Sequence, residues 1–176
     1  MIKIIVAFDK NRGIGYKGTI PWKVPGEMAW VAKKTKQVSS SNRKNALLMG
    51  RNTWDSLPTQ PLPERLNVII SRTKKIDTDN AISFSSIDDA FSFFSENEHI
   101  EDIYIFGGSE IYSLALSKGI VDEIITTEIQ GEFECDTWFQ AIPESFKLHT
   151  EREYTYNNNV VKRRYYINGS TKNGDV

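Results

Sequence analysis

The carboxylate best placed to do chemistry in this sequence is that of Glu27. It lies one turn into a predicted helix from Gly26 to about Gln37, on a broad face shared with Met28 and Val31. A carboxylate on that face points to the interior or to a cleft, where it needs a partner because burial of an unpaired charge is costly. The alternative is a carboxylate that complements the helix dipole, and periodicity alone favours this alternative.

Two glycine-containing turns follow predicted strands and precede predicted helices: Met49-Gly50-Arg51-Asn52-Thr53 and Phe106-Gly107-Gly108-Ser109. Glycine lets a backbone approach a ligand closely, and helix N-termini offer free N–H groups to phosphate oxygens. Two such turns could hold the two phosphates of a dinucleotide. For either turn taken alone, a glycine that merely ends a strand is the favoured interpretation. The Gly-x-Gly-x-x-Gly pattern of Rossmann domains is absent.

Two cationic positions could bind anionic groups. The segment Ser71-Arg72-Thr73-Lys74 follows a predicted strand, and a cation there could meet the 2′-phosphate of NADP, although a solvated basic turn is equally favoured. Arg65 could bind a carboxylate through two parallel hydrogen bonds, but a lone arginine is more often on the surface. The four tryptophans are each more typical of a core than of a ligand platform: Trp22, Trp30, Trp54 and Trp138.

Strands and helices alternate through the first two-thirds of the chain, which predicts a mostly parallel central sheet of about eight strands with helices on both faces. A closing antiparallel pair forms the C-terminal edge, with a turn at Asn157-Asn158-Asn159. In such sheets ligands bind beyond the carboxyl ends of the strands. Strands are predicted at residues 2–8, 46–49, 66–71, 103–106, 121–129, 146–156 and 160–168.

Local signals place several boundaries. Residues 9–23 are expected to form a long loop, and Pro25 suits the first position of the helix that follows. Further helices are expected after Gly50, after Ser86 and from Ser109. Ser86 and Asp89 have capping-box spacing. Residues 1–168 are expected to form one domain, followed by a frayed polar tail at residues 169–176.

Composition bounds the class of protein. The 176 residues are 39% hydrophobic and 26% charged with a net charge of −1, which indicates a globular protein and does not call for nucleic acid. Cys135 is the only cysteine, so no internal disulfide is possible and a reducing, cytoplasmic location is expected. The apolar run Ile2–Phe8 is too short for a membrane span. His99 and His149 lie far apart, and no metal site is expected.

The sequence resembles dihydrofolate reductases over about residues 2–168. Seven stretches occur in family order with family-like spacing, and together they are highly specific. They are Gly13-Ile14-Gly15 with Pro21-Trp22, Pro25–Trp30, Met49–Trp54, Leu62–Arg65, Val68–Arg72, Phe106–Tyr112 and Asp136–Phe139. This resemblance implies the dihydrofolate reductase-like fold and reduction of 7,8-dihydrofolate to tetrahydrofolate with NADPH, which supports one-carbon metabolism and thymidylate and purine synthesis.

The resemblance also implies a substrate site. Glu27 matches the family's acid that binds the 2-amino and N3 edge of the pterin, Thr127 the threonine paired with it, and Trp22 the tryptophan beside the ring. Arg65 matches the arginine that holds the α-carboxylate of the glutamate tail. The backbone carbonyls of Ile5 and Phe106 match contacts to the 4-amino group of inhibitors. The implied pocket wall is Val6, Ala7, Met28, Val31, Leu57 and Leu62.

For the cofactor, the resemblance implies a mobile lid at Gly13–Trp22, phosphate contacts at Arg51, Asn52 and Thr53, and 2′-phosphate contacts at Ser71 and Arg72. The Gly107-Gly108 peptide bond is expected to be cis. Further implied contacts are Ala7, Ile14, Gly15, Gly50, Ser109, Glu110, Ile111 and Tyr112. The protein is expected to act as a monomer on small molecules, dihydrofolate and antifolate inhibitors among them.

Two positions depart from the common family pattern: Val31 stands where phenylalanine is usual, and Glu64 where glycine is usual. Two rivals are less consistent with the sequence. The pyrimidine reductases of riboflavin synthesis share the fold and cofactor but lack a helix carboxylate placed like Glu27. A non-catalytic NADP-binding protein would not need Glu27, Thr127 and Arg65 together.

Overall fold

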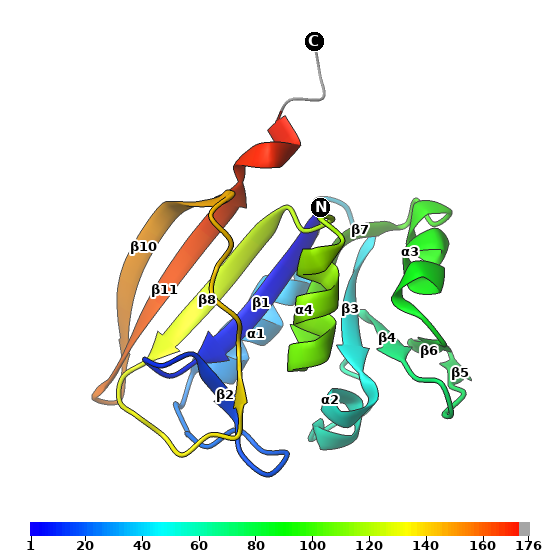
Figure 1. The fold of residues 1–176 in the computed structure, drawn as a ribbon. Coiled ribbons are helices and arrows are strands. Elements are labelled where there is room, and N and C mark those ends of the chain that lie inside the picture. Colours follow the sequence, from blue (N-terminus) through cyan, green and yellow to red (C-terminus); the bar gives the residue numbers. More distant parts are fainter. Residues whose placement is uncertain (173–176) are drawn as a thin grey trace.

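The computed structural model describes residues 1–172, and it contains a nine-stranded mixed sheet (Figure 1). The central strands pair in parallel, whereas the C-terminal edge and the short β5–β6 pair are antiparallel. The predicted mostly parallel sheet with an antiparallel C-terminal edge is confirmed. In spatial order the strands are β10 (Phe146–Tyr156), β11 (Asn159–Asn168), β8 (Glu123–Ile129), β1 (Ile2–Phe8), β7 (Ile100–Gly107), β3 (Lys44–Gly50), β4 (Leu66–Ile70), β6 (Ala81–Phe84) and β5 (Asp77–Thr78).

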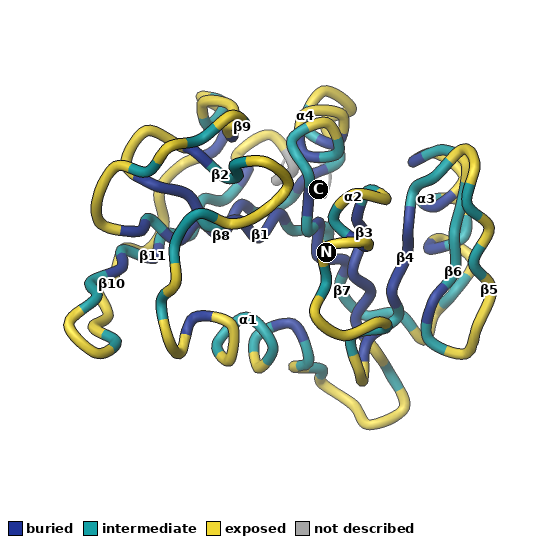
Figure 2. The backbone as a smooth tube through the Cα atoms, turned by 90° about the horizontal axis from the view of Figure 1, so that it is seen from below, coloured by how far each residue is buried: buried dark blue, intermediate teal, exposed yellow. Residues whose placement is uncertain are grey.

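Helices cover both faces of this sheet. Helices α3 (Ile87–Ser95) and α4 (Ser109–Ser117) pack on one face, and α1 (Glu27–Lys36) and α2 (Arg51–Ser56) pack on the other. Along β1, Ile4 and Val6 therefore point into one apolar cluster while Ile5 points into the second. Buried residues are concentrated in β1, β3, β4, β7 and β8 (Figure 2). Burial on both faces explains why the centres of these strands are mostly apolar in sequence.

Two predicted boundaries can be compared with the structure directly. Pro25 does not occupy the first helical position, because α1 begins at Glu27 after Gly26, whose φ of 92° is left-handed. Ser86 does cap α3, and its side chain accepts a hydrogen bond from the Asp89 amide at 3.1 Å. The predicted cap at Ser86 is confirmed. The predicted position of Pro25 is wrong, because Pro25 lies in a turn before the helix.

Two short pairings were not predicted, β2 with β9 and β5 with β6. Strand β2 (Gly13–Gly15) lies inside the expected loop 9–23 and pairs with β9 (Thr137–Trp138). Strands this short carry no periodicity that distinguishes them from loop. The expected β10–β11 turn is present, with positive φ at Asn157 and Asn158. The predicted tail begins with a 3-10 turn at Gly169–Lys172, and residues 173–176 lie outside the described part of the chain.

Candidate active site

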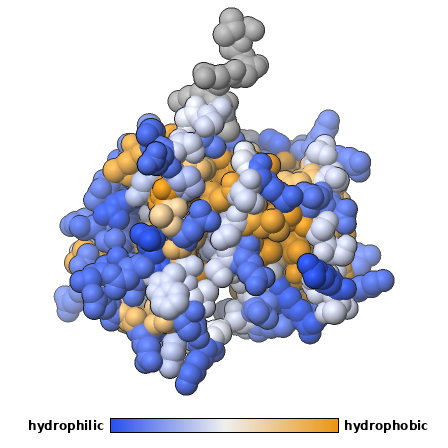
Figure 3. Space-filling view, in the orientation of Figure 1, coloured by the Kyte–Doolittle hydropathy of each residue, from blue (hydrophilic) through white to orange (hydrophobic). Residues whose placement is uncertain are grey.

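A cleft of about 1300 Å³ opens at the carboxyl ends of the parallel strands, where the sequence predicted a ligand site. Figure 3, in the orientation of Figure 1, shows the face of the molecule that carries α3 and α4, with hydrophobic residues gathered over the region between these two helices. Many predicted site residues line the cleft: Ile5, Val6, Ala7, Ile14, Gly15, Glu27, Val31, Gly50, Arg51, Asn52, Thr53, Ser71, Arg72, Phe106, Gly108, Ser109, Glu110, Ile111, Tyr112 and Thr127.

Glu27 lines the cleft and is paired with an arginine from the far end of the chain. Its Oε2 accepts a hydrogen bond from Nη2 of Arg163 at 2.6 Å. Glu27 is 7% exposed and Arg163 is 1% exposed, so this is a buried ion pair. Oε1 of Glu27 is also buried and accepts no hydrogen bond from any described residue. Glu27 is therefore the first residue of α1, where a carboxylate complements the helix dipole, and it also lines a cleft and has a partner, as the other interpretation required.

Thr127 lies beside this pair on β8, opposite Ala7 of β1 and Arg163 of β11. Its hydroxyl oxygen accepts a 3.4 Å hydrogen bond from Nε of Arg163. No hydrogen bond joins Thr127 to Glu27 among the described residues. The threonine and the acid are thus linked through the guanidinium of Arg163, which contacts both.

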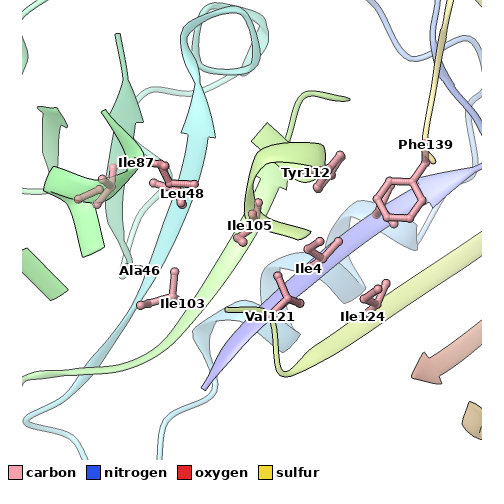
Figure 4. Packing of buried hydrophobic residues seen from close by; sticks show 14 of the residues in the cluster. Ile4, Ala46, Leu48, Ile87, Ile103, Ile105, Tyr112, Val121, Ile124 and Phe139 are labelled. Atoms are coloured by element: carbon pink, nitrogen blue, oxygen red, sulfur yellow. The ribbon is translucent and has the colours of Figure 1, made fainter. Parts of the chain in front are cut away.

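Tyr112 fixes α4 against β1 at the edge of the cleft. Its hydroxyl donates a hydrogen bond to the Ile5 carbonyl at 3.0 Å, and its ring packs edge-on against Phe139 (Figure 4). Burial raises the pKa of the Tyr112 hydroxyl, so it stays a neutral donor. The contact positions the β1 backbone at the point where this strand lines the cleft.

The two glycine turns lie side by side because β3 and β7 are neighbours, with Met49 paired with Gly107. A Cβ on Gly50 would lie 3.3 Å from Cγ1 of Ile111 and 3.9 Å from the Gly107 carbonyl oxygen. Gly107 has a φ of 111°, which side chains rarely adopt, and its peptide bond to Gly108 is cis as expected. Both turns therefore bring bare backbone to one wall of the cleft, as a dinucleotide's phosphates require.

Cationic and hydroxyl groups gather where β4 ends. Ser71, Arg72 and Thr73 line the cleft there. Arg51 of α2 donates from Nη1 to the Thr73 hydroxyl oxygen at 2.9 Å, and its Nε lies 3.5 Å from Asp55. The two predicted cofactor segments, one after β3 and one after β4, therefore meet through Arg51.

Arg65 is buried, at 2% exposed, so the surface position favoured for a lone arginine is wrong. Its Nε donates to the Pro63 carbonyl at 2.9 Å and its Nη1 to the Thr35 hydroxyl at 3.0 Å. Burial lowers the pKa of this guanidinium, while neighbouring Glu64 raises it. Glu64 itself has a φ of 64°, in the region that favours glycine, and it pairs with Lys36 at 3.0 Å.

Several predicted residues do not line the cleft. Met28 is 70% exposed, because one residue turns a helix by about 100° and carries it away from Glu27. Trp22 packs against Phe133, with ring centroids 5.5 Å apart. The others are Leu57 and Leu62, which pack in the cluster that contains Trp54, together with Arg65 and Gly107.

Arg163 is the site residue that the sequence analysis missed. It lies two residues after Val161, which is fully buried, so both occupy the inward phase of β11. That alternation was a usable signal for a buried cation. A strand prediction for residues 160–168 does not by itself say which inward residue meets Glu27.

Among the residues that the structure describes, no group of three or more metal-ligating side chains is found, and no helix is long and apolar enough to cross a membrane. The cleft itself brings together a carboxylate, the guanidinium paired with it and the two glycine turns. This arrangement suits a site that binds two organic molecules next to each other.

Comparison with known proteins agrees with this geometry. The family model described as dihydrofolate reductase matches residues 1–168. A dihydrofolate reductase of Drosophila melanogaster is 35% identical over 148 residues, which cover 82% of this chain and 81% of that protein. A putative dihydrofolate reductase of Caenorhabditis elegans is 40% identical over 147 residues (80% and 78%), and one of Heliothis virescens is 35% identical over 159 residues (86% of each).

The match spans the cleft and both glycine turns, and it excludes the two rival interpretations, a pyrimidine reductase and a non-catalytic cofactor-binding protein. The product of the family's reaction, tetrahydrofolate, supports one-carbon metabolism. The chain therefore belongs to the dihydrofolate reductase family and reduces dihydrofolate with hydride from a nicotinamide cofactor.

Proposed function

We propose that the hydride donor is NADPH and that the pterin ring of dihydrofolate binds against Glu27. The observation that carries the substrate assignment is Oε1 of Glu27, a buried oxygen in the cleft with no donor among the described residues. Buried polar atoms are nearly always hydrogen-bonded, so this oxygen fits a ligand that brings its own N–H groups. The 2-amino and N3 edge of a pterin supplies such donors.

The choice of NADPH is supported by the wall at the end of β4. Arg72 is exposed beside Ser71 and Thr73, and Arg51 contacts Thr73. A 2′-phosphate would find charge-assisted donors there, whereas the 2′-hydroxyl of NADH needs none of these cations. Gly50 and Gly108 leave room for the two bridging phosphates. When bound, the cofactor supplies the hydride.

The protein's own contribution is positioning and electrostatics. Glu27 lies where its charge can stabilise a protonated pterin without touching the nitrogen that receives the proton, which water would deliver. Ile14, Gly15 and Gly18–Ile20 line the cleft, and Ile20 is 65% exposed, so this loop can act as a lid that controls water access. Arg65 is assigned to the carboxylate of the substrate's tail. The monomeric state, the cytoplasmic location and the binding of antifolates remain predictions.

Replacing Glu27 with Gln tests the substrate assignment. The amide keeps the shape and removes the charge, so we expect Glu27→Gln to lose most turnover near neutral pH, with part of the loss recovered at low pH. The assay is the decrease in NADPH absorbance on addition of dihydrofolate. Glu98→Gln makes the same change at an exposed position outside the cleft and serves as the matched control.

The variant also leaves Arg163 as a buried cation without its partner, which destabilises the fold by about 3–5 kcal/mol in comparable cases. NADPH affinity must therefore be measured beside turnover. Unchanged turnover at neutral pH in a protein that still binds NADPH would remove Glu27 from the mechanism.

A further inference from the structure

We propose that Arg163 is a specificity-determining residue: beside Glu27 it makes the site select a neutral 2-amino and N3 edge of the ring over a protonated one, whereas the proton of the reaction goes to a nitrogen that Glu27 does not touch. This inference rests on the proposed role of Glu27 and adds to it. The structure shows a carboxylate that lines the cleft, with one oxygen paired with a buried guanidinium and the other buried without a donor among the described residues.

The position of the guanidinium is fixed by its surroundings. Its central carbon lies 3.4 Å from the ring centroid of Trp30 on α1 and 4.8 Å from that of Tyr154 on β10. Its Nε is held by Thr127 on β8. Cations bind favourably over aromatic faces, and more so when they are desolvated. Arg163 is therefore held by three elements besides Glu27, and it does not swing freely toward water.

The division of the hydrogen bonds places the arginine behind the acid. Nη2 of Arg163 uses Oε2 of Glu27, whereas Oε1 has no donor among the described residues. Glu27 lines the cleft and Arg163 does not. A ligand at this wall therefore meets a carboxylate whose charge is already compensated and whose second oxygen has no donor among the described residues.

This arrangement separates neutral from cationic ligands by simple electrostatics. A neutral edge with two N–H groups needs only acceptors, which the carboxylate still offers. A protonated edge would place a second cation on the same buried carboxylate, opposite Arg163. At an effective dielectric constant of about 20, two like charges about 6 Å apart repel enough to change an affinity roughly 100-fold.

Folic acid and 4-amino-4-deoxyfolic acid form a matched pair of probes. They share the tail and the ring skeleton, and the 4-amino group makes the ring basic. The quantity to measure is the ratio of their two dissociation constants, in the presence of NADPH, in the unaltered enzyme and in Arg163→Met and Arg163→Lys. Methionine keeps much of the length without charge, and lysine keeps the charge without the planar fork.

We expect Arg163→Met to shift this ratio about 10- to 100-fold toward the 4-amino compound, while Arg163→Lys stays near the unaltered enzyme. General damage to the pocket would weaken both compounds together and leave the ratio unchanged. A ratio in Arg163→Met within about twofold of the unaltered enzyme would overturn the proposal, as would an equal shift in the lysine variant.

A second measurement needs no variant, so it decides the matter even if Arg163→Met does not fold. Calorimetry in buffers of different ionisation heat counts the protons taken up when the 4-amino compound binds, above the pH at which the free compound is protonated. We expect uptake well below one proton per site in the unaltered enzyme. Uptake of a full proton would refute the role of Arg163 and would leave the Glu27→Gln test of the proposed function unaffected.

Discussion

Replacing Arg65 with leucine has two separable consequences that follow from its contacts. The first concerns folding. Arg65 is buried, and it donates one hydrogen bond to the Pro63 carbonyl and one to the Thr35 hydroxyl. A hydrogen bond contributes about 0.5–1.5 kcal/mol, and more when one partner is charged, so losing both should lower the free energy of unfolding by about 2–4 kcal/mol. Leucine recovers some of this by packing.

The second consequence concerns the substrate. Two of the five N–H groups of Arg65 are used by Pro63 and Thr35, which holds the fork in place and leaves the others for a carboxylate. A charge-assisted contact of this kind is worth about 1.5–3 kcal/mol, so Arg65→Leu should weaken dihydrofolate roughly 10- to 150-fold. NADPH and a small pterin-like inhibitor without a carboxylate tail should bind almost as before, because neither reaches Arg65.

The assay is therefore a set of three dissociation constants, measured at a temperature where urea titration shows the variant to be folded. Arg65→Lys is the matched control, since it keeps the charge and loses the fork, and it should recover only part of the dihydrofolate affinity. If Arg65→Leu weakens the tail-less inhibitor as much as dihydrofolate, Arg65 supports the fold and does not anchor the tail.

Three further predictions concern charged residues in or near the cleft. Arg72→Ala should weaken NADPH by about 1.5–3 kcal/mol and NADH far less, and equal losses in fluorescence titrations would show that Arg72 does not contact the 2′-phosphate. Glu64→Gly removes a negative charge next to Arg65, so it should tighten dihydrofolate binding modestly at low salt and less at high salt, and binding without salt dependence would contradict this. The free energy of unfolding should change by no more than about 1 kcal/mol, because relief of the left-handed backbone at residue 64 offsets the lost ion pair with Lys36. Hydrogen bonds from the Lys17 amide and the Thr137 hydroxyl lower the pKa of Asp136. The hydrogen bond between Lys17 and Asp136 should therefore be complete above about pH 3.9 and be lost only as the pH falls through the lowered pKa. A Lys17 amide resonance that titrates above about pH 4 would refute this.

Most of the fold could be predicted because both faces of the sheet are covered. Strands buried on two sides appear as continuous apolar runs, and the strands predicted at residues 2–8 and 66–71 were identified in this way. Strands β2, β5, β6 and β9 are only two to four residues long, and their pairing depends on partners elsewhere in the chain. No local signal encodes such a pairing, so they were missed.

The cofactor wall was predictable for a related reason. Each glycine turn directly follows a strand, and the rule that ligands bind beyond the strand ends places both turns at one edge. The structure brings Gly50 and Gly107 together because β3 and β7 are neighbours. The burial of Arg65 was not predictable in this way, since it depends on Thr35, which lies one helix and one strand earlier in the chain.

The partner of Glu27 shows where sequence reasoning stops. Helical periodicity says that a carboxylate on this face needs a partner if it is buried, and the buried phase of β11 includes Arg163. Bringing them together requires the order of β11, β8 and β1 and the register that sets Arg163 opposite Thr127. A slip of one residue along β11 would turn Arg163 to the other face of the sheet and leave Glu27 as an isolated buried charge. The ion pair therefore links the register of β11 to the chemistry of the cleft. For this reason we expect a substitution at Arg163 to change the relative affinities of the cleft for neutral and protonated ligands.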